Sequence, residues 1–185
     1  MASPQKLAHV VLYSSQVPVM RDWYLKVLDA HVVFETPAGV FLTYDDEHHR
    51  IAIATPNAAA DLGNGAEALA GGDPEGGRSK ALGHIAFTYA SLRELLENWE
   101  RLAAESVLPF LAVNHGPTTS MYYADPDGNH IELQIDNFAT VEEGTAFMQS
   151  DSFARNLFGE TFEPADKLAE LRAGATVSEL VTPTW

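Results

Sequence analysis

The stretch "LGHIAFTY" at residues 82–89 repeats the pattern of "LAHVVLYSS" at residues 7–15, and this repeat indicates the fold. Both stretches are short, rich in β-branched or aromatic residues, and carry a histidine at the third position, which predicts a strand in each case. A helical segment and three further strand-like segments follow each of them. The order β-α-β-β-β therefore occurs twice, and each copy alone would leave one face of its sheet uncovered.

The segments between these strands follow the same order in both copies. In the first copy, apolar residues recur at helical spacing and three strand-like segments follow. The helical stripe comprises Met20, Trp23, Tyr24, Val27 and Leu28, with Pro18 suited to the first turn, and the strands are predicted at 31–35, 39–44 and 50–55. In the second copy, Ser91 and Glu94 form a capping-box sequence before the helix. Its strands are predicted at 109–113, 120–124 and 130–135.

The repeat predicts one domain with a helical extension. A segment rich in Gly, Ala and Asn, including "GGDPEGG", separates the two copies and is predicted to be a loop. The predicted boundaries are 1–136 for the domain, with module one at 6–55, the loop at 56–81 and module two at 82–136, followed by an extension at 137–185. In the extension we expect a short helix that ends at Gly159 and a second helix that starts near Pro164.

Composition narrows the classes of function. The chain has 185 residues, 46% of them hydrophobic, and a formal net charge of −15, which argues against binding to nucleic acid or to an anionic membrane surface. It has no cysteine, so any metal site must use His, Asp or Glu ligands. The absence of a signal peptide and of a long apolar run leads us to expect a cytoplasmic protein.

Three polar residues stand on strand faces that the helices are expected to leave uncovered. Side chains alternate along a strand, which separates His9, His84 and Glu132 from their apolar neighbours. A single strand histidine or glutamate is ordinarily structural. Here two histidines occupy matching positions of the repeat and a carboxylate lies in the final strand. Two histidines and one carboxylate with open positions are the ligand set of non-haem Fe(II) oxygenases.

These features resemble the vicinal oxygen chelate superfamily, which includes glyoxalase I, bleomycin-resistance proteins and type I extradiol dioxygenases. The stretch "VNHGPTTSMYYADPDGNHIE" at 113–132 also fits the extradiol ring-cleavage signature. The matching positions are His115, Tyr122, the D-P-D-G turn at 125–128, and Glu132. The resemblance implies an α+β fold in which two tandem βαβββ modules form a cupped mixed sheet around a metal site.

The resemblance also implies roles for individual residues. His9, His84 and Glu132 would bind Fe(II), or less commonly Mn(II). Tyr122 would hydrogen-bond a catecholate oxygen, and His115 would line the site near the substrate or the reacting oxygen. A further active-site histidine is expected just before a strand of module one, and "EHHRIAIA" supplies two candidates. We choose His49, with His48 as the alternative. Strict alternation would instead place His48 on the face of Ala52. His130 receives no role.

The expected activity is extradiol cleavage of a catechol, such as a dihydroxybiphenyl, with O2 during degradation of aromatic compounds. We also expect a homo-oligomer. One alternative is a glyoxalase-type isomerase or lyase, which would use a second carboxylate where module one has Ala52. Thiol transferases of the fosfomycin-resistance type share the three-ligand set, and a metal-free drug-sequestering protein is a third alternative. Iron content of the purified protein distinguishes the last of these from a dioxygenase.

Overall fold

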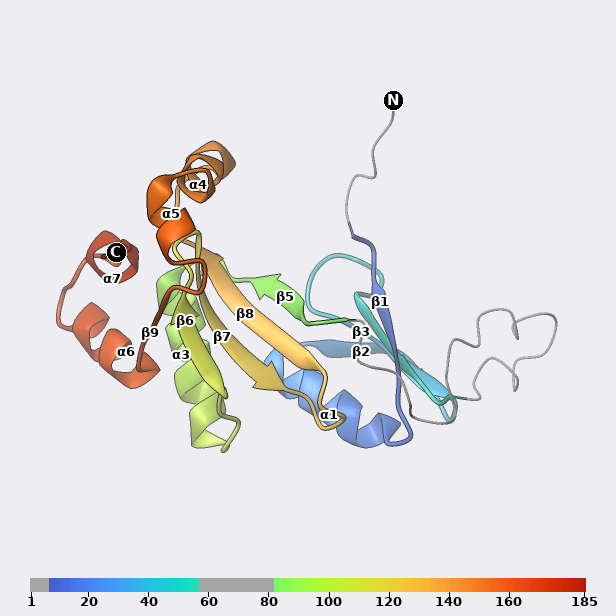
Figure 1. Ribbon diagram of the computed structural model, residues 1–185. Coiled ribbons are helices and arrows are strands. Elements are labelled where there is room, and N and C mark those ends of the chain that lie inside the picture. The colour runs from blue at the N-terminus through green and yellow to red at the C-terminus, as the bar shows by residue number, and fades with distance from the viewer. Residues whose placement is uncertain (1–6, 57–81) are drawn as a thin grey trace, which may run out of the picture. The chain divides into compact units, whose positions relative to one another are not determined.

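The computed structural model describes residues 7–56 and 82–185, and the chain divides into two compact units (Figure 1). The first unit comprises Met1–Ala81 together with the turn Asp125–Gly128, and the second comprises Leu82–Ala124 and Asn129–Trp185. The loop predicted at 56–81 lies outside the described residues except for Pro56. No helix in the described ranges is both long and apolar enough to cross a membrane.

Within its described residues, the first unit contains one four-stranded mixed sheet and one helix. Its elements in chain order are β1 (Val10–Tyr13), α1 (Val17–Val27), β2 (His31–Thr36), β3 (Gly39–Thr43) and β4 (Ile51–Ala54). The strand order is β1-β4-β3-β2, in which β1 and β4 run parallel and the other pairs run antiparallel. The β-α-β-β-β order predicted for module one is therefore confirmed.

Helix α1 covers the apolar face of this sheet. One face of the helix is buried and contacts β3 and β4, and Pro18 lies in its first turn, where no intrahelical N–H partner is needed. The buried residues of the helix and sheet are Val17, Met20, Tyr24, Val27, Leu12, Val40, Leu42, Ile51 and Ile53. Val11 and Phe41 alternate with these residues and are exposed. The opposite face of the sheet is therefore left uncovered within this unit.

The second unit repeats this topology and extends it by one strand. Its elements are β5 (Ile85–Thr88), α3 (Leu92–Ala104), β6 (Leu111–Asn114), β7 (Thr118–Ala124) and β8 (His130–Asp136), with β9 (Glu160–Thr161) further along the chain. The strand order β5-β8-β7-β6-β9 matches that of the first sheet over four strands, again with a parallel first pair. The fold is thus α+β with two tandem βαβββ modules, as predicted.

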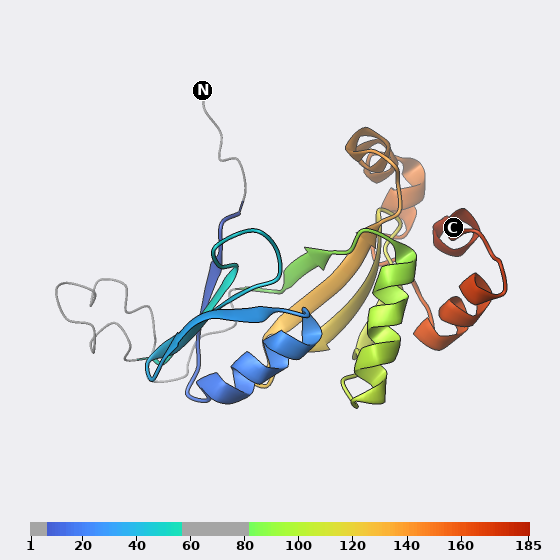
Figure 2. The same cartoon turned by 180° about the vertical axis from the view of Figure 1, so that it is seen from behind.

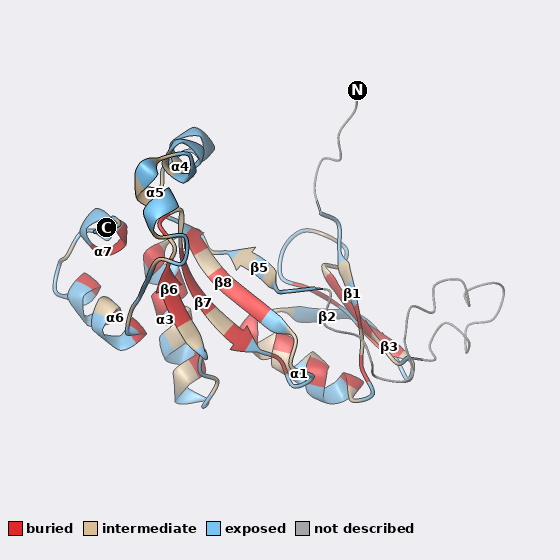
Figure 3. Ribbon diagram, in the orientation of Figure 1, coloured by how far each residue is buried: buried red, intermediate tan, exposed pale blue. Residues whose placement is uncertain are grey.

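Helix α3 begins where the sequence predicted and packs on the second sheet (Figure 2). The Ser91 hydroxyl accepts a hydrogen bond from the Glu94 N–H at 3.2 Å, which satisfies one of the orphan amides of the first turn. Four leucines form the buried stripe of the helix: Leu92, Leu95, Leu96 and Leu102. Ile131 and Leu133 of β8 are likewise buried, so that strand is buried along most of its length (Figure 3).

The C-terminal extension is mainly helical, but it also contributes the edge strand β9. It contains α4 (Val141–Met148), α5 (Asp151–Arg155), α6 (Pro164–Arg172) and α7 (Val177–Val181). The helix expected near Pro164 is confirmed. The helix expected to end at Gly159 is wrong, because α5 ends at Arg155 and residues 156–159 form a turn that leads into β9. This strand pairs antiparallel with Val113 and Asn114 of β6.

Candidate metal and substrate site

The two predicted histidine ligands occupy equivalent positions in the two modules. His9 directly precedes β1, and His84 directly precedes β5. In each module this strand is the one that runs parallel to the module's last strand. The repeat seen in the sequence therefore corresponds to a structural equivalence of the two histidines.

Strand register also shows which residue of module one corresponds to Glu132. In module two, Ala86 is the second residue after His84, and it pairs with Glu132 of β8. In module one, Val11 is the second residue after His9, and it pairs with Ala52 of β4. Module one therefore carries a methyl group where module two carries a carboxylate.

His84 and Glu132 lie together within the second unit. The Nε2 atom of His84 is 2.9 Å from Oε2 of Glu132, whose side chain is 6% exposed. A buried carboxylate is costly unless charge or hydrogen-bond donors compensate it. Imidazole nitrogen and carboxylate oxygen are also suitable donors for ferrous iron. The pair therefore fits two of the three predicted ligands.

The third predicted ligand, His9, belongs to the first unit. Among the described residues, no group of three or more His, Asp or Glu side chains is arranged to hold a metal ion. The structure thus brings His84 and Glu132 together and leaves the complete set of three ligands as a prediction.

Tyr122 and His115 form a hydrogen-bonded pair beside His84 and Glu132. The hydroxyl of Tyr122 lies 2.9 Å from Nε2 of His115. Tyr122 is the register partner of Glu132, and its ring centroid is 5.5 Å from that of His84. Burial and the nearby Glu132 carboxylate raise the pKa of Tyr122 above its usual range. Its phenol is therefore protonated at neutral pH and can act as a hydrogen-bond donor.

His130 makes an aromatic contact with Phe110. The exposed ring of Phe110 lies 4.9 Å from the ring of His130 and 6.2 Å from that of Tyr122. Phe110 immediately precedes β6, where the chain bends. This ring adds an apolar surface next to Tyr122.

In the first unit, the histidine pair before β4 lies beside His9. The ring centroid of His49 is 4.4 Å from that of His9 and 5.1 Å from that of Phe41, while His48 contacts His49 at 4.6 Å. Because both histidines precede the first residue of β4, Ile51, strand alternation does not govern them. The contact of the His49 ring with His9 favours His49 over His48 as the active-site histidine. Partial burial, together with the charges of His9 and His48, lowers the pKa of His49.

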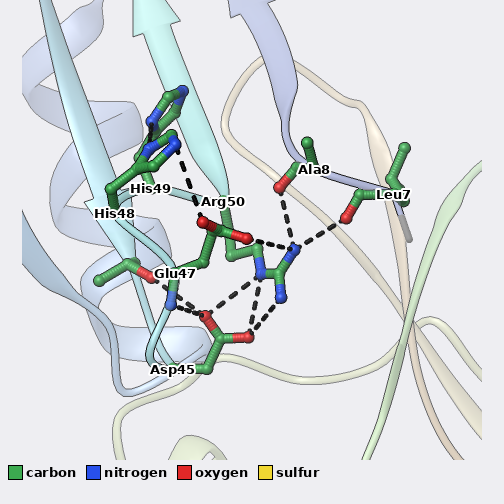
Figure 4. A network of polar contacts seen from close by, with 8 residues as sticks. Leu7, Ala8, Asp45, Glu47, His48, His49 and Arg50 are labelled. Carbon is green, nitrogen blue, oxygen red and sulfur yellow. Dashed lines mark hydrogen bonds and ion pairs between the residues drawn. The ribbon is translucent and has the colours of Figure 1, made fainter. Parts of the chain in front are cut away.

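Arg50 connects the segment that carries His49 to the backbone that carries His9 (Figure 4). Its Nη1 atom donates to the carbonyl oxygens of Leu7 at 2.8 Å and Ala8 at 3.0 Å. Its Nε and Nη2 atoms both lie 2.9 Å from Oδ2 of Asp45. A planar guanidinium suits such a branched set of acceptors. Arg50 therefore holds the two carbonyls that directly precede His9.

Sequence reasoning did not identify Arg50 or Phe110 as residues of the site. Arg50 reaches the segment before His9 through the backbone carbonyls of Leu7 and Ala8, which leave no residue-type signal in a sequence. Phe110 lies within the strand predicted at 109–113, whereas the observed β6 begins at Leu111. Its position depends on a local bend that has no distinctive residue pattern.

Comparison with known proteins supports the same family. The family described as "Glyoxalase/Bleomycin resistance protein/Dioxygenase superfamily" matches residues 6–133. The chain is 44% identical over 183 residues to biphenyl-2,3-diol 1,2-dioxygenase 3 of Rhodococcus globerulus, covering 97% of this chain and 89% of that relative. It is 40% identical over 185 residues to biphenyl-2,3-diol 1,2-dioxygenase 2 of the same organism, covering 100% and 91%.

A solved structure agrees at the level of the fold. Lactoylglutathione lyase from Agrobacterium tumefaciens superposes with a TM-score of 0.53 at 18% identity, covering 72% of this chain and 96% of that chain. The repeated modules, the equivalent histidines and the matched residues lead to one conclusion. The chain belongs to the Glyoxalase/Bleomycin resistance protein/Dioxygenase superfamily.

Proposed function

We propose that this chain is an Fe(II)-dependent extradiol dioxygenase that opens the ring of a catechol of the biphenyl-2,3-diol type. In this reaction one ring C–C bond next to the diol breaks and both atoms of O2 enter the product. The observation that carries the proposal is the pairing of His84 with Glu132 beside the Tyr122–His115 hydrogen bond. Relatives with 44% and 40% identity are biphenyl-2,3-diol dioxygenases, which supports the substrate class.

Each residue of the proposed site has a distinct task. His9, His84 and Glu132 would hold the metal, which would supply Lewis-acid and redox chemistry toward the diol and O2. Tyr122 orients a diol oxygen with its phenolic proton. His115 holds or releases a proton at Nε2, the nitrogen that faces Tyr122. His49, beside His9, contacts the substrate from the first module. The same ligands would also hold Mn(II) as a less common substitute for Fe(II). A cytoplasmic location and a homo-oligomeric assembly are further parts of the proposal.

Ala52 weighs against the glyoxalase-type alternative. That alternative needs a second carboxylate at the position equivalent to Glu132, and the strand register places a methyl group there. The His115–Tyr122 pair likewise has no evident use in a drug-sequestering protein. These observations favour ring cleavage over the glyoxalase-type and the drug-sequestering alternatives.

The test is anaerobic reconstitution of the purified protein with Fe(II), followed by O2 and a panel of catechols that includes 2,3-dihydroxybiphenyl. We expect a yellow ring-fission product, and we expect its loss in Glu132→Ala and His84→Ala together with loss of bound iron. Gln134→Ala is the matched control, because Gln134 lies on the same strand face as Glu132. Stoichiometric iron without product from any catechol would overturn the proposal.

A further inference from the structure

We propose that the C-terminal extension is part of the active site, because the backbone carbonyl of Phe158 sets the tautomer of His115. This inference rests on the proposed function for its catalytic meaning. The superfamily match ends at residue 133, so it does not include the segment concerned. The argument begins with the two nitrogens of the His115 ring.

The His115 ring has a polar partner on each side. Its Nδ1 atom is 2.6 Å from the carbonyl oxygen of Phe158, and its Nε2 atom is 2.9 Å from the hydroxyl of Tyr122. A carbonyl oxygen can only accept a hydrogen bond, so Nδ1 must carry the hydrogen. In the neutral ring, Nε2 is then left with a lone pair that faces the Tyr122 hydroxyl. The carbonyl therefore makes Nε2, the nitrogen on the substrate side, the basic nitrogen.

A clamped turn presents this carbonyl. The side chain of Asn156 donates from Nδ2 to the Gly159 carbonyl at 3.1 Å and accepts at Oδ1 from the Gly159 N–H at 2.9 Å. These two bonds enclose Phe158. Asn156 is thus a positioning residue, which acts on His115 through the backbone it holds.

Gly159 fixes the same turn against the strand that leads to His115. Its φ is +94°, and a Cβ at this position would lie 2.0 Å from the carbonyl oxygen of Asn114. The residues that follow Gly159 form β9 and pair with Val113 and Asn114. A side chain larger than hydrogen would push the turn away from the backbone next to His115.

A second contact ties the extension to the same strand end. Asn114 is buried, and its Nδ2 atom donates to the carbonyl of Val181 at 2.8 Å, while its Oδ1 atom accepts from the Gly116 N–H at 2.8 Å. The residues on both sides of His115 are therefore held by the extension or by Asn114. The geometry of His115 depends on residues more than 40 positions away in the sequence.

The first test reads the tautomer directly. Long-range ¹H–¹⁵N spectra of the full-length protein with ¹⁵N-labelled histidine would be recorded with diamagnetic Zn(II) in place of Fe(II). We expect His115 to be protonated at Nδ1. A ring protonated at Nε2 alone would overturn the inference. Because neither substrate nor turnover is involved, this result is independent of whether the protein cleaves catechols.

The second test compares two glycine variants. Gly174 also has a positive φ, +104°, but a Cβ there would meet nothing within 4 Å. Gly159→Ala and Gly174→Ala therefore carry similar backbone strain, and only the first displaces the turn. We expect Gly159→Ala to lower kcat about 10-fold, the lower end of the range for loss of a hydrogen-bond partner that orients a metal-binding histidine. We expect KM to be nearly unchanged, and Gly174→Ala to match the wild type.

Asn156 provides a variant that leaves the strand backbone intact, in case Gly159→Ala does not fold. Asn156→Ala is expected to shift His115 toward a mixture of tautomers and to lower kcat. Asn156→Asp keeps the acceptor for the Gly159 N–H and is expected to recover part of both properties. A wild-type tautomer and a wild-type kcat in Asn156→Ala would contradict the proposal.

Discussion

Ala52 of β4 and Glu132 of β8 occupy the same register position in their two modules. Each pairs with the residue two places after the module's leading histidine. This relationship makes the two modules chemically unequal although their topologies match. A metal site with one carboxylate retains positions for substrate, whereas a second carboxylate would close one of them.

Introducing a carboxylate at position 52 is expected to block catalysis without loss of metal. In Ala52→Glu, the new side chain would compete with the catechol for an open position. We expect bound iron to stay stoichiometric while the rate of O2 uptake with catechol falls more than about 10-fold, equivalent to about 1.4 kcal/mol. Ala52→Gln has nearly the same size and no charge, and it controls for steric effects. Wild-type turnover in Ala52→Glu would contradict the site assigned to this sheet face.

Replacing Arg50 is expected to weaken metal retention. In Arg50→Lys, the lysine keeps the positive charge of the arginine. It cannot contact two carbonyls and Asp45 at once. We expect Fe(II) affinity, measured by competition with a chelator, to fall about 10-fold because the backbone before His9 is less well held. Arg172→Lys is the matched control, since Arg172 makes a bidentate contact with Glu100 at the surface. Equal iron retention in the two variants would show that Arg50 has no role in positioning His9.

Tyr24 is expected to make the free energy of unfolding decrease as the pH rises above about 10. Its hydroxyl donates to Oδ2 of Asp125 at 3.1 Å, and burial followed by the Asp125 charge raises its pKa. The folded state therefore holds this proton more tightly than the unfolded state, whose pKa is about 10. The stabilisation is complete below pH 10 and is lost as the pH rises toward the folded-state pKa, at about 1.4 kcal/mol per pH unit.

Urea unfolding at pH 8 and pH 11 measures this effect. Tyr24→Phe should lose about 1 kcal/mol at pH 8 through the missing hydrogen bond. Between the two pH values, its free energy of unfolding should fall less than that of the wild type. Parallel declines for the two proteins would refute the assignment.

Removing apolar contacts of the extension is expected to destabilise the second unit. Leu168 of α6 is buried, and α6 packs against α3. Leu168→Ala should lower the free energy of unfolding by about 2–5 kcal/mol. Val141→Ala, at a position that is 81% exposed, should change it by less than about 0.5 kcal/mol.

Deletion of residues 140–185 should impair folding or assembly. A deletion variant with unchanged oligomeric state and activity would contradict this expectation.

Much of the fold could be predicted because the signals were local or repeated. Alternation and helical spacing gave the βαβββ order of both modules, and the paired histidines followed from comparing the two copies. The structure places His84 beside Glu132, and His115 beside Tyr122. These residues are recognisable because their chemistry lies in their own side chains.

The remaining features depend on backbone groups and long-range contacts. Strand β9 has only two residues, which is too short for an alternating pattern to be visible. The carbonyls of Phe158, Leu7 and Ala8 act irrespective of the side chains that accompany them. Register between strands, which decided the equivalence of Ala52 and Glu132, becomes definite only when the pairing is known.

The pairing of β9 with β6 also bears on how the protein behaves during expression. Without residues 160–161, the backbone groups of Val113 and Asn114 that now pair with β9 would face solvent at the edge of an apolar strand. Exposed edges of this kind recruit strands from other molecules and lead to aggregation. The short strand therefore protects the sheet against self-association, and truncation of the chain before Glu160 would be expected to produce insoluble protein.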